Sequence, residues 1–146
     1  MKHSNDRILT THVGSLPRPD DLVELLHLKE QGEAYDHEAF DQCVAKSVDT
    51  IVARQVATGI DLVSDGEMSK ISYATYLKDR LNGFDGTARE NRAAADLLDY
   101  MTYARRLVAQ GGTERSLQGP ACDGPLSVRD EVPLRNDLAN FAAAVR

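Results

Sequence analysis

The sequence predicts an α/β fold in which βα units place about three short parallel strands beside their helices. The β-branched segment 8–16 and the apolar run 60–64 are typical of strands, the segment 116–121 suggests a third strand, and a helical pattern follows each of them. Such alternation indicates right-handed βα units. Three strands leave two sheet edges open, whereas a closed (βα)8 TIM-type barrel needs roughly 250 residues. With 146 residues, the chain (1–146) is expected to form the N-terminal part of such a barrel, as one incomplete domain.

The first strand and the first two helices are bounded by turn signals. Two prolines within 17–19 end the first strand, because proline lacks a donor N–H. A helix is predicted over 22–31, ending at Gly32. The longest helix is predicted over 36–58, because apolar residues recur there at intervals of three and four: Phe40, Val44, Val48, Ile51, Val52 and Val56.

The second half of the chain is predicted to hold three more helices. They are expected over 72–81, 93–110 and 134–145, and the polar residues 84–95 are expected to form a surface loop. The third strand is broken at its end by prolines. The last helix should present one apolar face, made of Leu134, Leu138, Phe141 and Val145.

Charge and composition exclude several classes of partner. Lys and Arg number 17 against 23 Asp and Glu, a net charge of −6. Because an acidic surface repels phosphate backbones, nucleic acid is not expected as a partner. No apolar stretch approaches the ~20 residues that cross a membrane, and no signal-peptide cleavage site is present. Two cysteines without CxxC spacing are typical of reduced thiols. We therefore expect a cytoplasmic protein with no nucleic-acid or membrane partner.

Two loops carry the candidate chemistry, and both follow predicted strands, at the face where barrel enzymes hold their active sites. In the loop 10–19, Gly14 permits a sharp turn, and Ser15 offers a hydroxyl and an N–H to a small polar substrate. In the loop 63–67, Asp65 and Glu67 bracket a glycine and could bind an ammonium group. A structural turn at Ser15 and solvated acids at 65 and 67 remain the alternatives from pattern alone.

His12 is a third candidate, as a hydrogen-bond donor to substrate, although a strand-end histidine is more often structural. The sequence contains no dinucleotide-binding glycine motif, P-loop or nucleophile elbow. These absences argue against dinucleotide, nucleoside-triphosphate and serine-hydrolase chemistry.

Taken together, the loop motifs resemble those of the cobalamin-independent methionine synthases, in particular short relatives of their catalytic C-terminal barrel. The resemblance is carried by ThrThrHisValGlySer (10–15), by GlnValAlaThrGlyIleAsp (55–61) and by the GlyGlu pair at 66–67. The segment GlyProAlaCysAspGlyPro (119–125) resembles the third-strand segment of the same family.

The resemblance implies a (βα)8 barrel that moves a methyl group from a methyltetrahydrofolate-type donor to the thiol of homocysteine. It also implies a zinc ion that activates the thiol. Ser15 and the backbone around Gly14 would bind the amino-acid end of homocysteine, and Glu67 would receive its ammonium group. The substrate contacts are therefore expected from His12, Val13, Gly14, Ser15, Asp65 and Glu67.

Two departures bear on this expectation. Asp65 and His12 stand where the full-length synthases carry histidine and threonine, respectively. The family's zinc ligands include a His-x-Cys pair, and the chain has no such pair. We therefore assign no metal ligand and no catalytic residue, and we expect the chain to be inactive alone.

Two alternatives remain open. One keeps the barrel but changes the reaction to zinc-dependent alkyl transfer onto another thiol, as in epoxide–thiol transferases. The other is a non-catalytic, dimerising binding module derived from the barrel. Such a module would cover its open sheet edges with a second copy or with a complementing chain.

Overall fold

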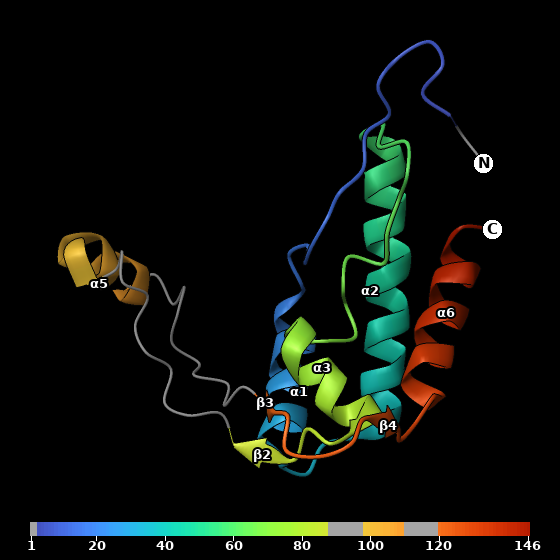
Figure 1. Cartoon of the computed structure of the whole chain (residues 1–146). Helices are drawn as coiled ribbons and strands as arrows, with labels where there is room; N and C mark the ends of the chain where they lie inside the picture. Colours follow the sequence, from blue (N-terminus) through green and yellow to red (C-terminus); the bar gives the residue numbers. More distant parts are fainter. Residues whose placement is uncertain (1–2, 88–97, 110–119) are drawn as a thin grey trace.

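The computed structural model describes residues 3–87, 98–109 and 120–146 (Figure 1). Within them lie helices α1 (Asp20–Gln31), α2 (His37–Ala57), α3 (Tyr73–Arg80), α5 (Met101–Ala109) and α6 (Val132–Ala144). The strands are β1 (Leu81–Asn82), β2 (Gly86–Thr87), β3 (Pro120–Ala121) and β4 (Ser127–Val128). The described part is thus a mixed structure in which helices predominate.

The helices lie close to where the sequence predicts them. The expected helices 22–31, 36–58, 72–81 and 134–145 correspond to α1, α2, α3 and α6. The helix expected over 93–110 overlaps α5, while 93–97 and residue 110 lie outside the described residues. Local capping explains the starts of two helices. The Asp36 side chain accepts a hydrogen bond from the backbone N–H of Ala39 at 3.0 Å, and the Ser72 side chain accepts one from the backbone N–H of Thr75 at 3.2 Å.

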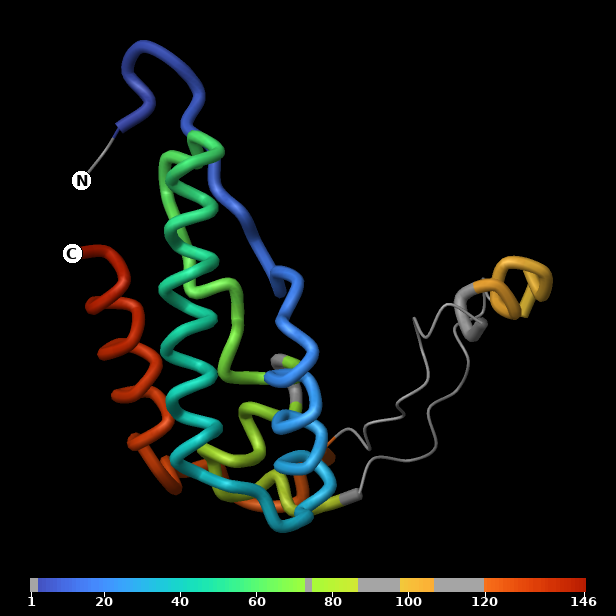
Figure 2. Tube along the Cα trace, turned by 180° about the vertical axis from the view of Figure 1, so that it is seen from behind, coloured from blue at the N-terminus to red at the C-terminus, as the bar shows by residue number. Residues whose placement is uncertain are grey.

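A small apolar core joins α1 and α2 to the chain that follows α2, and α6 runs beside α2 in both backbone views (Figures 1 and 2). Of the face predicted for α6, Phe141 packs against this core together with Ala144, whereas Leu134, Leu138 and Val145 are exposed. The predicted apolar face is therefore only partly covered, because α6 turns its Phe141–Ala144 side toward α2. The core consists of Leu22, Leu26, Phe40, Val44, Val48, Ile51, Val52 and Met68.

The prediction of about three parallel strands is wrong for the described residues. The segments 8–16 and 60–64 lie alongside each other but meet in a single parallel bridge, between Thr11 and Leu62. The third segment contributes β3, which pairs antiparallel with β2, while its residues 116–119 lie outside the described part. The remaining two strands, β1 and β4, also pair antiparallel. A parallel ladder is stable only in larger sheets covered on both faces, and two segments alone do not provide one.

No barrel is formed by residues 3–87, 98–109 and 120–146. The region expected to be an irregular loop, 84–95, contains β2, and its residues 88–95 lie outside the described part. None of the described helices is both long and apolar enough to cross a membrane.

Candidate functional site

The candidate site forms where the two extended segments lie side by side. The backbone N–H groups of Asp61 and Leu62 donate to the carbonyl oxygen of Thr10, at 3.2 and 3.1 Å. The Thr11 hydroxyl donates to the Leu62 carbonyl oxygen at 2.8 Å. These bonds fix the register of the two segments, so the loops that follow them, 12–19 and 63–70, emerge next to each other.

Asp61 ties the start of this pairing together. Its carboxylate forms an ion pair with the Arg7 guanidinium and accepts hydrogen bonds from the backbone N–H of Thr10 at 2.9 Å and from the Thr10 hydroxyl at 3.1 Å. The hydrogen bond from Arg7 is the largest cause that holds the pKa of the Asp61 carboxyl well below its usual range.

Gln55 fixes the second segment against α2. Its side-chain amide donates to the Ser64 carbonyl oxygen at 2.8 Å, and its side-chain oxygen accepts from the Ser64 N–H at 3.0 Å. Gln55 is buried, so this pair of bonds satisfies polar groups that would otherwise be costly to bury. The segment that ends at Ser64 is thereby held in place directly before Asp65.

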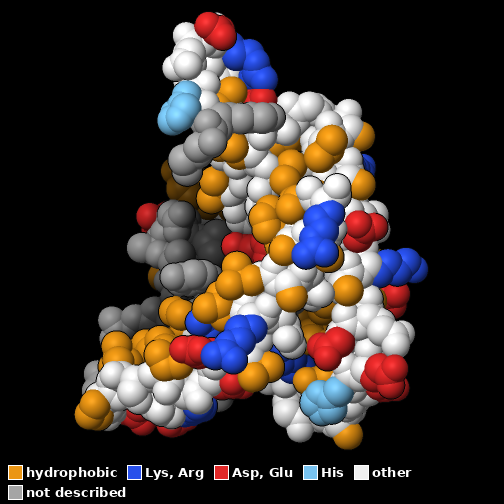
Figure 3. All heavy atoms as spheres, turned by 90° about the vertical axis from the view of Figure 1, so that its right-hand side faces the viewer, with side chains coloured by type: hydrophobic (Ala, Val, Ile, Leu, Met, Phe, Trp, Pro, Cys, Tyr) orange, Lys and Arg blue, Asp and Glu red, His pale blue; other side chains and the backbone are white. Residues whose placement is uncertain are grey.

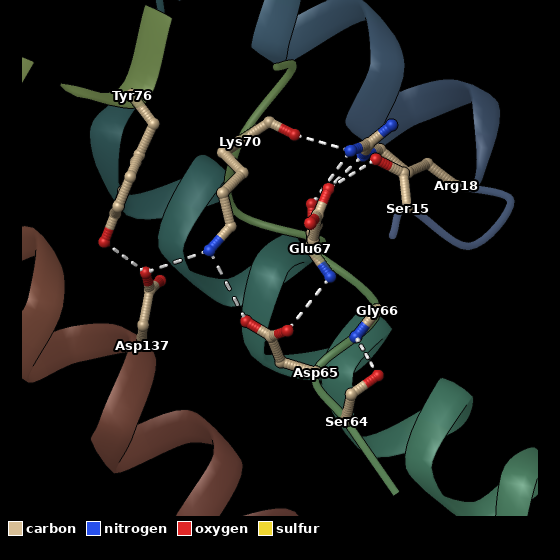
Figure 4. Close-up of polar contacts among 9 residues, drawn as sticks. All are labelled: Ser15, Arg18, Ser64, Asp65, Gly66, Glu67, Lys70, Tyr76 and Asp137. Carbon is tan, nitrogen blue, oxygen red and sulfur yellow. Dashed lines mark hydrogen bonds and ion pairs between the residues drawn. The ribbon is translucent and has the colours of Figure 1, made fainter. Parts of the chain in front are cut away.

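Ser15 and Glu67 meet at the end of the two segments. The Ser15 hydroxyl donates to a Glu67 carboxylate oxygen at 2.6 Å (Figure 4). The backbone reinforces this contact, because the N–H of Leu16 donates to the Gly66 carbonyl oxygen at 3.0 Å. Two residues that lie 52 positions apart in the chain are thus brought into direct contact, as a common site requires.

The other predicted site residues are placed differently. Gly14 has a φ of 94°, so the sharp turn predicted there is present. The Val13 side chain is 87% exposed. His12 has a buried Nε2 atom without a hydrogen-bond partner in the described residues. Asp65 accepts from the Glu67 N–H at 3.0 Å and lies 3.7 Å from Lys70 Nζ, so it supports the turn rather than meeting Ser15.

Three residues near this turn, Arg18, Lys70 and Asp137, carry no signal that sequence reasoning used. Arg18 donates to backbone carbonyl oxygens of the turn, and Lys70 lies between the carboxylates of Asp65 and Asp137 (Figure 4). Asp137 stands on α6 and accepts from the Tyr76 hydroxyl at 2.6 Å. Arg18 lies between two prolines in the sequence, and nothing in that pattern predicts which carbonyl groups it reaches.

The Tyr76–Asp137 contact is partly buried. Burial first, and then the hydrogen bond to Asp137, raise the pKa of Tyr76 to about 12. Lys70 Nζ lies 4.5 Å from the centre of the Tyr76 ring, a cation–π distance. This network therefore joins the turn that carries Glu67 to α3 and α6.

The chemical capacity of the site is that of a small polar binding site. Glu67 offers a carboxylate to a cation, and the exposed residues 13–15 offer a hydroxyl and N–H donors. Within the described residues, no group of three or more His, Cys, Asp and Glu side chains is arranged to hold a metal ion. These residues therefore do not fit a zinc centre.

The fold and the site define a class: a protein built of helices and extended segments, with polar contacts on the loops after two segments paired in parallel. Part of the chain is distantly homologous to the cobalamin-independent methionine synthases. No protein-family model matches the chain.

Three relatives illustrate the extent of the similarity. The methionine synthase of Sulfolobus acidocaldarius is 35% identical over 75 residues, 51% of this chain and 22% of the relative. That of Pyrococcus furiosus is 31% identical over 107 residues, 68% of this chain and 31% of the relative. The 5-methyltetrahydropteroyltriglutamate–homocysteine methyltransferase of Corynebacterium glutamicum is 24% identical over 157 aligned positions, 94% of this chain and 21% of the relative. The chain thus spans about a fifth to a third of these relatives.

Proposed function

We propose that this chain provides the amino-acid contacts of a methionine-synthase-like methyltransferase, as the N-terminal part of a (βα)8 barrel. The reaction is methyl transfer from a methyltetrahydrofolate-type donor to the homocysteine thiol. The observation that carries the proposal is the 2.6 Å hydrogen bond between Ser15 and Glu67. It supports a shared site on the two loops that resemble the family's substrate loops.

The residues fit the two charged groups of an amino acid. The Glu67 carboxylate binds the ammonium group of homocysteine by a charge-assisted hydrogen bond. When the ammonium group takes its place beside Glu67, the Ser15 hydroxyl is released to donate to the substrate carboxylate together with the neighbouring backbone N–H groups. The thiol end extends away from these contacts.

The proposal includes binding without turnover by this chain alone. The family resemblance implies zinc, but the donor set of the described residues does not fit a metal ion. Binding energy on the amino-acid end alone does not lower the barrier to attack on a methyl group.

Calorimetric titration with L-homocysteine tests the proposal. We expect Glu67→Gln to weaken binding at least ~10-fold, because it removes the charge that faces the ammonium group, and Ser15→Ala to weaken it about 3-fold or more. The control is Glu33→Gln, which removes an exposed carboxylate outside the site and should leave the Kd unchanged. Equal affinity of the wild type and the Glu67 variant would contradict the proposal.

A second proposal concerns a partner of the chain, either a second copy or a complementing chain. It is favoured by the apolar side chains of the paired segments, because Ile8 and Val13 are each 87% exposed and Leu62 is 45% exposed. Sedimentation equilibrium should give a mass above the 16.0 kDa of one chain, and a charged substitution, Val13→Lys, should shift the mass toward the monomer. A wild-type monomer at tens of micromolar would reject self-association.

A further inference from the structure

Arg18 reaches from the loop after the first segment to the turn that carries Glu67. Its Nη2 atom donates to the carbonyl oxygens of Glu67 at 2.9 Å and of Lys70 at 2.6 Å, and its Nε atom lies 3.3 Å from the same Glu67 oxygen. Figure 4 shows the guanidinium beside the backbone of this turn, on the side that holds Ser15. One side chain thus spans both ends of the turn 67–70.

Glu67 has a backbone conformation that needs such support. Its φ is 57°, the only positive φ at a non-glycine residue in the part of the chain that the structure describes. The left-handed region is unfavourable for an ordinary residue, so surrounding contacts must hold Glu67 there. The Asp65 carboxylate fixes the Glu67 N–H from one side, and Arg18 fixes the Glu67 carbonyl from the other.

The chemistry of arginine suits this role. A planar guanidinium presents several N–H donors in a fixed fork, whereas a lysine ammonium lacks that geometry. Arg18 forms no ion pair within 4.0 Å among the described residues. Burial lowers the pKa of Arg18, and the nearby charge of Glu67 opposes that shift. The guanidinium is therefore half-buried against backbone carbonyls rather than against a carboxylate.

We propose that Arg18 is a positioning residue for the amino-acid site. It fixes the turn 67–70 so that the Glu67 carboxylate faces Ser15. The proposal rests on the function proposed above, in which Glu67 receives the ammonium group of the ligand. Its consequence is selectivity, because a carboxylate held in place favours a ligand with an ammonium group over one without it more strongly than a mobile carboxylate does.

The test compares two ligands by calorimetry: L-homocysteine, and 4-mercaptobutanoate, which lacks the amino group. Selectivity is the ratio of their Kd values. We expect Arg18→Met to lower the selectivity at least ~5-fold, mainly through weaker homocysteine binding, and Arg18→Lys to restore part of it. The matched control is Arg54→Met, because Arg54 lines the same groove of about 420 Å³ as Arg18 and should leave the selectivity unchanged.

The ratio of the two Kd values distinguishes a positioning role of Arg18 from a merely structural one. If Arg18→Met weakens both ligands equally, or leaves both Kd values unchanged, the positioning role is overturned. If Arg18→Met does not fold, Arg18→Lys and Arg18→Gln are compared in the same way.

Failure of the proposed function has a separate signature, which is a wild type that does not distinguish the two ligands. Arg18 is then tested without ligand, by amide hydrogen exchange at Leu16 and Glu67, whose N–H groups are bonded within this turn. Faster exchange at both amides in Arg18→Met than in Arg54→Met supports the positioning role, and equal exchange overturns it.

Discussion

Gly66 and Glu67 form the tightest part of the site, because both have positive φ values, 64° and 57°. Gly66 is buried, and a Cβ atom there would lie 2.9 Å from Met68 Cε, 3.2 Å from Leu16 Cβ and 3.3 Å from Ile51 Cγ2. The close packing around Gly66 thus couples the candidate site to the apolar core. Only glycine satisfies both the backbone angle and the space at this position.

This crowding predicts that Gly66→Ala destabilises the fold more than a matched glycine substitution. Gly32 has a similar φ of 70°, but no heavy atom lies within 4 Å of its virtual Cβ. Gly32→Ala should lower the free energy of unfolding by the backbone strain alone, about 1 kcal/mol. Gly66→Ala should cost about 1–2 kcal/mol more, because three side chains must shift. Urea unfolding of both variants gives the comparison, and equal costs would show that the core yields freely around Gly66.

At the scale of elements, the helices could be predicted and the strand pairing could not. Periodicity and capping are local, so α2 is recognised from its apolar residues and begins after Asp36 as a capped helix should. Pairing is non-local: nothing near 120–121 in the sequence indicates that this segment pairs antiparallel with β2. Arg18 was missed for the same reason, because its partners lie about 50 residues away.

For the candidate site, Ser15 and Glu67 could be named from the loops and the family resemblance. Their direct contact follows from the pairing of Thr11 with Leu62, a parallel arrangement that βα units favour. The supporting contact between Tyr76 on α3 and Asp137 on α6 could not be predicted, since it depends on how those helices pack around Lys70.

The pairing of the two segments should depend on pH through Asp61. Its pKa in the folded chain is lower than in the unfolded chain, where an aspartate titrates near about 3.9. The stabilisation is therefore fully present above that value and is lost as the pH falls through the folded pKa. We expect Asp61→Asn to be less stable than the wild type at pH 5 to 7. The difference between their free energies of unfolding should narrow below about pH 4.

Urea unfolding at several pH values measures this difference. The control is Asp49→Asn on the exposed side of α2, which should stay within about 0.5 kcal/mol of the wild type. A difference for Asp61→Asn that stays constant down to pH 3 would show that Arg7 and Thr10 do not stabilise the charged carboxylate.

At the scale of the whole molecule, apolar surface remains uncovered on several elements. Figure 3 looks onto the side that carries α6 and shows hydrophobic side chains spread among charged ones. Val132, Leu138 and Val145 of this region are each more than half exposed. Together with the exposed side chains of the paired segments, this surface supports the proposal that the chain functions with further βα structure around it.

The central claim is that the loops carrying Ser15 and Glu67 act as one amino-acid site, and a double-mutant cycle tests it most directly. The Kd for L-homocysteine is measured for the wild type, Ser15→Ala, Glu67→Gln and the double variant. Because both side chains touch each other and the same ligand, the double variant should lose at least ~2-fold less affinity than the product of the single losses. Losses that multiply independently, or an absence of homocysteine binding by the wild type, would contradict the account.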